Sequence, residues 1–75
     1  MITKNIKLST IDAVRTFVNT VSKYDVDIDL KSGRYVVDAK SIMGIFSLDL
    51  MNEIEMTIYA DEADAILADL EKFFA

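Results

Sequence analysis

The chain has 75 residues, 52% of them hydrophobic, with no Cys, no His and a formal net charge of −5. Without Cys the chain has neither a disulfide framework nor a thiolate metal site, and without His it lacks the commonest metal ligand and general base. The negative charge disfavours nucleic acid and anionic membrane surfaces as partners, because both are polyanions, so we expect a protein partner and no metal or cofactor.

The composition also bears on organisation and location. No apolar run approaches the roughly 18 residues that span a bilayer, and residues 1–5 lack the apolar stretch of a signal peptide. The chain has no Pro, only two Gly, and no repeat or linker. We therefore expect one cytoplasmic domain over residues 1–75.

The first predicted strand covers residues 2–8. Ile2, Ile6 and Leu8 would face one side of a sheet, and the intervening polar residues would face the other. Lys4 is the only residue that breaks this alternation. The pattern is typical of a strand with one buried face.

A helix is predicted from about Thr10 to Lys23. Ser9 and Thr10 precede it, and Asp12 follows Ser9 at the spacing of a capping box. Apolar residues then recur at helical spacing: Ile11, Val14, Phe17, Val18 and Val21.

Residues 25–30 and 35–39 are predicted as two strands joined by a hairpin at Lys31–Arg34, which contains Gly33. Asp25, Asp27 and Asp29 alternate along the first of these strands. Such carboxylates project in parallel, almost 7 Å apart, and do not converge on one ion. We expect them to form a solvated face, without metal.

The last two predicted elements are a strand over residues 53–60 and a helix capped by Asp61. Apolar residues line one side of this helix: Ala63, Ile66, Leu67, Leu70, Phe73 and Phe74. The predicted order is therefore β-α-β-β-α-β-α. One apolar face per strand favours a single sheet covered by helices on one side, with the fourth strand antiparallel between the first and the second.

Between the third and fourth strands, residues 39–48 predict one short helical turn that begins after Ser41. If Ile45 faces the sheet together with Leu48, then Ile42, Met43 and Phe46 project outward. The alternative is that Met43 and Phe46 fill the core, as apolar helix residues usually do.

Three segments together resemble the HPr family of the bacterial sugar phosphotransferase system: Lys40–Leu48 (KSIMGIFSL), Thr20–Tyr24 (TVSKY) and Glu55–Asp61 (EMTIYAD). The resemblance covers essentially the whole chain. It implies an α+β open-faced β-sandwich, with a four-stranded antiparallel or mixed sheet covered by three helices on one face.

The resemblance also implies a position for the family's phosphohistidine, in a G-I-H-A-R-P-A type loop before the first helix. Counted back from Ser22, the His position falls on Thr10, the Arg position on Asp12 and the Pro position on Ala13. Because the chain has no His, we expect no phosphohistidine transfer. A hydroxyl ester at Ser9 or Thr10 is a poor relay, so these residues are expected to serve as a helix cap.

Ser41 aligns with the serine that a dedicated kinase phosphorylates in many HPr proteins. A phosphate there would lie at a helix N-terminus, and Ser41 also suits the simple role of N-cap. In the family, the apolar positions matching Ile42, Met43 and Phe46 bind partner proteins. The resemblance implies an enzyme I-like protein, HPr kinase or a catabolite control regulator as partner.

Three functions remain open at this stage. The first is an HPr-like regulatory or adaptor protein that is phosphorylated on Ser41. The second is a divergent HPr paralogue that binds an unknown protein without phosphorylation. The third is a small ligand-binding or enzymatic domain outside the phosphotransferase system. Its only supporting feature is the carboxylate pair Glu53 and Glu55, which has no pocket motif beside it. We expect no catalytic residues and a monomer or weak dimer.

Overall fold

The computed structural model describes residues 1–75 and contains the predicted order of strands and helices. A short 3-10 helix, η1, follows the last α-helix. The elements are β1 (Ile2–Ile6), α1 (Ile11–Val21), β2 (Ile28–Ser32), β3 (Tyr35–Asp38), α2 (Ile42–Phe46), β4 (Ile54–Ile58), α3 (Asp64–Leu70) and η1 (Glu71–Phe73).

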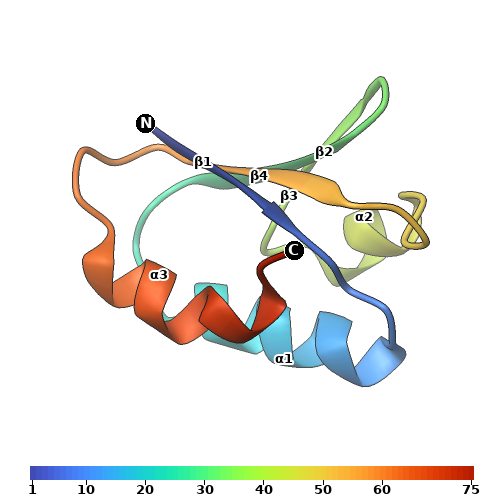
Figure 1. Ribbon diagram of the computed structural model, residues 1–75, viewed down its shortest axis with the longest axis horizontal. Helices are drawn as coiled ribbons and strands as arrows, with labels where there is room; N and C mark the ends of the chain where they lie inside the picture. The colour runs from blue at the N-terminus through green and yellow to red at the C-terminus, as the bar shows by residue number, and fades with distance from the viewer.

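The four strands form one sheet in the order β1-β4-β2-β3, and each neighbouring pair is antiparallel. β4 therefore lies between β1 and β2, as predicted. Ile58 shows this position, because it pairs with Ile2 on one side and with Ile28 on the other. All the helices cover the same face of the sheet (Figure 1), which confirms the open-faced α+β architecture.

The core lies between this sheet face and the helices, and it consists of one cluster of 17 apolar residues. Phe17 of α1 is fully buried and meets Phe73 edge to face, with 5.5 Å between the ring centroids. The sheet contributes its alternating apolar side chains, which are fully or almost fully buried: Ile6, Ile28, Leu30, Ile54, Met56 and Ile58. The alternation in the sequence thus identified the buried face correctly.

The connection between α1 and β2 is longer than predicted. α1 ends at Val21 with Ser22 as its C-cap, and β2 begins only at Ile28, so the predicted strand start at Asp25 is wrong. The chain needs these residues to travel from the helix layer to the sheet. The other predicted strands are each shorter at one or both ends by one or two residues, and the hairpin turn is confined to Gly33 and Arg34.

The helix starts differ in part from the prediction. Of the two expected caps of α1, Thr10 is the N-cap, and its Oγ1 accepts a hydrogen bond from the Ala13 N–H at 3.0 Å; the capping-box spacing of Ser9 and Asp12 is not used. The first residue of the predicted apolar stripe, Ile11, is 62% exposed. α3 begins at Asp64 after Ala63 and has no side-chain cap, so the predicted cap Asp61 is wrong.

Packing explains where α1 and α3 begin. Leu8 is fully buried as the last residue that the first segment inserts into the core, so the chain turns outward immediately after it. Ala63 is likewise buried, with 5% of its surface exposed. A polar capping side chain at that position would lie in apolar surroundings, which is costly without a full set of hydrogen bonds.

The C-terminal segment explains why Lys4 interrupts the alternation of apolar residues along β1. The Lys4 ammonium lies 5.8 Å from the centroid of the Phe74 ring, a cation–π contact. The same segment runs along β1, where Phe73 C=O accepts from the Lys7 N–H and Asn5 C=O accepts from the Ala75 N–H. The charged residue therefore faces the helix side at a place where an aromatic ring covers the sheet edge.

The other face of the sheet is polar, as predicted. Asp29 of β2 lies on this face and accepts a hydrogen bond from the Tyr59 hydroxyl at 3.0 Å. Asp25 and Asp27 are exposed as expected, but they precede β2, so the predicted row of three aspartates on one strand is wrong. No group of three or more acidic side chains is placed to hold a metal ion. None of the helices combines the length and the apolar composition that a membrane span requires.

Tyr24 connects the segment after α1 to α3 through a hydrogen bond from its hydroxyl to the Asp69 carboxylate. This bond is the main reason why the pKa of Tyr24 is raised, with smaller contributions from the loss of water and from the charge of Asp69. The folded protein therefore holds the Tyr24 proton more tightly than the unfolded chain does. Stability from this group is complete below the unfolded pKa of about 10 and is lost as the pH rises through the folded pKa.

We predict that Tyr24→Phe reduces the fall in stability above about pH 10, because the variant has no Tyr24 proton to lose. Urea unfolding measured from neutral to strongly alkaline pH checks this. Tyr35→Phe is the matched control, since the Tyr35 side chain is 69% exposed. Identical alkaline slopes for wild type and Tyr24→Phe would contradict the assignment.

Candidate functional site

The short helix α2 is held in place by buried residues at its C-terminal end. Ile45 is fully buried and Leu48 is 7% exposed, both within the core cluster. An isolated helix of five residues would not be stable in water, because nucleation costs more than so few hydrogen bonds return. The position and shape of α2 therefore depend on its packing against the rest of the protein.

Ser41 is the N-cap of α2, as predicted. Its backbone is extended, and its Oγ accepts a hydrogen bond from the Gly44 N–H at 3.2 Å. The Ser41 side chain is exposed. It is thus accessible to another protein while it caps the helix.

Gly44 allows α2 to lie close to β3. A Cβ atom built on Gly44 would lie 3.2 Å from both Ser41 Oγ and Val37 Cβ, closer than most such contacts. A glycine at this position lets the helix backbone approach the strand without displacing either side chain.

Lys40 ties the start of α2 to the segment after α1. Its Nζ donates to the Tyr24 C=O at 2.8 Å, and its backbone N–H donates to Asp38 Oδ1 at 2.8 Å. No local sequence pattern indicates either bond. Together with the Ser41 cap, they define the backbone path that presents the helix.

The outward side chains of α2 form an exposed apolar surface. Met43 is 77% exposed, Phe46 is 41% exposed, and Ile42 is partly buried against the core. The alternative that Met43 and Phe46 fill the core is therefore wrong. We call Ile42, Met43 and Phe46 the α2 patch.

The start of α1, where the resemblance placed the family's phosphorylation loop, carries a hydroxyl and a carboxylate. The Thr10 Oγ1 is engaged as the helix cap, and Asp12 is exposed in the first turn. The negative charge of Asp12 suits the positive end of the helix dipole but would repel a bound phosphate. Arg15, one turn further along α1, is also exposed.

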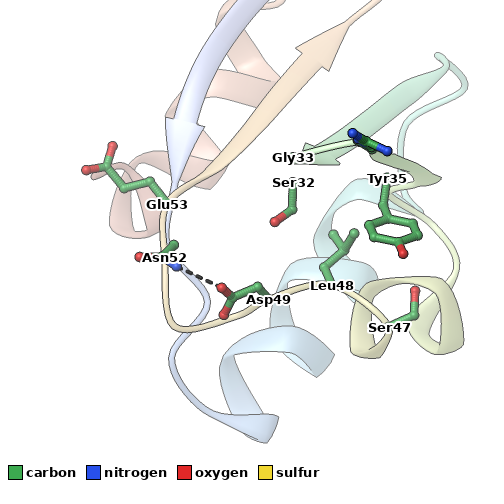
Figure 2. A pocket seen from close by; sticks show the side chains of 9 residues that line it. Ser32, Gly33, Tyr35, Ser47, Leu48, Asp49, Asn52 and Glu53 are labelled. Atoms are coloured by element: carbon green, nitrogen blue, oxygen red, sulfur yellow. Dashed lines mark hydrogen bonds between the residues drawn. The ribbon is translucent and has the colours of Figure 1, made fainter.

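A cavity of about 610 Å³ opens beside the C-terminal end of α2 (Figure 2), and the sequence did not predict it. The β2–β3 turn, the end of α2 and the connection to β4 form its walls. The lining residues are Ser32, Gly33, Arg34, Tyr35, Ser47, Leu48, Asp49, Asn52 and Glu53. These come from segments that only the fold brings together, so no local motif could have indicated the cavity.

The polar groups of this cavity do not form a pair of free carboxylates. Asp49 Oδ1 accepts from the Met51 N–H at 3.1 Å, and Asp49 Oδ2 accepts from Asn52 Nδ2 at 2.7 Å. The Glu53 carboxylate points away from the cavity in Figure 2. Glu55 does not line it. The cavity thus lacks the facing carboxylates that glycosidase chemistry needs.

Comparison with known proteins agrees with this architecture. Residues 11–75 match the family model described as the "PTS HPr component phosphorylation site". The match begins immediately after Thr10, the residue to which the family's histidine position was assigned.

Two solved structures are similar over nearly the whole chain. HPr-C-His from Thermoanaerobacter tengcongensis has a TM-score of 0.81 and 26% identity, and the alignment covers 96% of this chain and 89% of that one. The phosphocarrier protein HPr from Bacillus anthracis str. Ames has a TM-score of 0.74 and 25% identity, with 99% and 96% covered.

We predict that Ile45→Ala destabilises the protein by about 2–5 kcal/mol, because it removes a fully buried side chain of α2. Met43→Ala in the same helix should change the free energy of unfolding by no more than about 0.5 kcal/mol, because Met43 is exposed. Urea denaturation of both variants measures the difference. Equal losses would show that α2 is not packed as described.

Proposed function

The chain belongs to the HPr family of the phosphotransferase system, whose members carry phosphoryl groups and interact with other proteins of that system, and from this we propose that it is a regulatory or adaptor protein that docks without carrying phosphohistidine. One observation carries the proposal: the chain has no histidine, yet Met43 and Phe46 of its α2 patch are exposed on a well-packed helix.

The loss of phosphohistidine transfer follows from chemistry. A relay needs a group that accepts a phosphoryl group and readily releases it, and a serine or threonine ester releases it poorly. Thr10 offers only a hydroxyl, and its oxygen is engaged as the helix cap. Asp12 replaces the cation that the resemblance places beside the phosphate and would raise the energy of a second anion.

The proposed docking surface is the α2 patch. Methionine and aromatic side chains adapt to a partner surface through flexible and polarizable contacts. Burying Met43 and Phe46 under a partner would remove apolar area from water, which is the main favourable term in protein association. Because Ile45 and Leu48 hold the helix from below, the patch is presented without reorganisation of the core.

Regulation would act through Ser41. Its hydroxyl is exposed, and a phosphate there would add a charge of about −1.5 to −2 directly beside the patch. The dipole of so short a helix stabilises that charge only modestly. The principal effect of the phosphate would therefore be to change which partner surfaces can bind the α2 patch. HPr kinase is the expected modifying enzyme, as the family resemblance implies.

A second candidate is a paralogue that docks on an unidentified protein with no phosphorylation. The hydrogen bond from the Gly44 N–H to Ser41 Oγ favours it, because capping alone is a sufficient reason for a serine at this position.

Incubation with HPr kinase and ATP distinguishes the two candidates. We predict that the intact mass rises by one phosphoryl group in wild type and that Ser41→Ala abolishes the gain. Ser47→Ala is the matched control, since Ser47 is also an exposed serine at the other end of α2. An unmodified wild type would reject the first candidate and favour the second.

Replacement of Phe46 tests the docking surface itself. A pull-down with the immobilised wild-type protein first isolates its protein partner. We predict that Phe46→Ala weakens binding to that partner by at least about tenfold, the usual effect of removing an aromatic side chain from the centre of an interface. Met51→Ala removes an even more exposed apolar side chain outside the α2 patch and should leave affinity unchanged. Equal affinities for wild type and Phe46→Ala would place the docking surface elsewhere.

A further inference from the structure

The outer edge of β3 has unused backbone hydrogen-bonding groups. The register pairs Ser32 with Tyr35 and Leu30 with Val37, and the Ala39 N–H donates to the Ile28 C=O. In an antiparallel ladder, alternate residues direct both backbone groups toward the partner strand. The N–H and C=O groups of Val36 therefore point away from β2, and so does the N–H of Asp38.

The two edges of the sheet differ in this respect. The C-terminal residues run along β1 and hydrogen-bond to it on both sides of Ile6, which bridges to Phe74. β3 has no such cover, and its exposed side chains include two large apolar ones. Tyr35 is 69% exposed and Val36 is 56% exposed. An uncovered edge with these side chains is a template for another strand.

We propose that β3 pairs antiparallel with β3 of a second copy of this chain, about a two-fold axis at Val36. In this register the two Val36 residues exchange a pair of N–H···O=C bonds across the axis. The Asp38 N–H of each copy faces the Arg34 C=O of the other. The two sheets would then continue as one.

Charge selects this register. Centring the axis on Val36 places the Arg34 side chain opposite Asp38 of the second copy, and symmetry repeats the pair. Centring it on Asp38 would oppose two aspartates, and centring it on Arg34 would oppose two arginines. Only the Val36 axis gives a symmetric pairing of opposite charges along this edge.

The charge of Asp38 within one copy supports the same pairing. Asp38 lies directly opposite Asp29 of β2, and like charges in this position destabilise a sheet. Arg34 of the second copy would lie on the other side of Asp38. In the single copy each carboxylate accepts one neutral hydrogen bond, Asp38 from the Lys40 N–H and Asp29 from the Tyr59 hydroxyl, and no cation lies between them. The guanidinium of Arg34 would add the opposite charge that this pair lacks.

The apolar side chains fit both faces of the joined sheet. The two Val36 side chains would meet on the polar face, where each is largely exposed in the single copy. Tyr35 would pack beside Val37 of the second copy on the helix face, in the closer, non-hydrogen-bonded type of pair. Because β3 has only four residues, the interface is small and belongs to the weak, transient class.

Sedimentation velocity over a range up to millimolar concentration tests the pairing. We expect a reversible monomer–dimer equilibrium in wild type and a dissociation constant at least about tenfold higher in Val36→Pro, which lacks the outward N–H but keeps the bonds to β2. Val36→Thr, which keeps the N–H and the β-branch, should dimerise like wild type. A wild type that stays monomeric throughout, or equal dimerisation by Val36→Pro, would overturn the proposal.

A charge exchange provides a test that does not depend on proline. Arg34→Glu and Asp38→Arg should each weaken the dimer about tenfold, and the double variant should restore it, because the pair is then reversed and still opposite in charge. Circular dichroism of each variant verifies the fold. Failure of the double variant to dimerise better than either single variant would overturn the proposed register.

Discussion

The burial of Ile45 and Leu48 beneath α2 is the contact on which the candidate working surface depends. Five helical residues cannot hold their conformation alone, so the core supplies the free energy that keeps them folded. Once the inner side of α2 is packed, the outer side must display Met43 and Phe46. Exposure of these two residues is thus a consequence of the way the helix is docked.

The two family positions of interest lie on different elements, one at the start of α1 and one at the start of α2. The start of α1 carries Thr10 and Asp12, which form a stable helix terminus with a capped N–H and a favourable charge. The start of α2 retains Ser41 and the glycine that permits close contact with β3. Thr10 caps α1 without a histidine, and Ile45 and Leu48 hold α2 by separate contacts with the core, so the fold itself needs no histidine at the start of α1.

Much of this architecture was predictable from the sequence because it depends on local alternation. The buried residues Ile54, Met56 and Ile58 show it in β4, and Gly33 provides the turn between β2 and β3 with a φ of 60°. The position of β4 followed from the handedness of crossover connections.

Other features depend on contacts that no local pattern contains. Asp61 looked like a helix cap, but the burial of Ala63 moved the start of α3 beyond its reach. Lys4 looked like an error in a strand, and only the position of Phe74 accounts for it. The hydrogen bond from Lys40 to Tyr24 also connects residues of separate segments. The cavity beside α2 is likewise lined by segments that only the fold brings together.

The proposed loss of phosphohistidine transfer can be tested by the intact mass of the protein after incubation with enzyme I and phosphoenolpyruvate. The phosphocarrier HPr from Bacillus anthracis, assayed in parallel, serves as the positive control. We expect no gain in mass for this chain, because it has no histidine to accept the phosphoryl group. A gain of one phosphoryl group would refute the loss of carrier activity and would require another residue to act as the carrier.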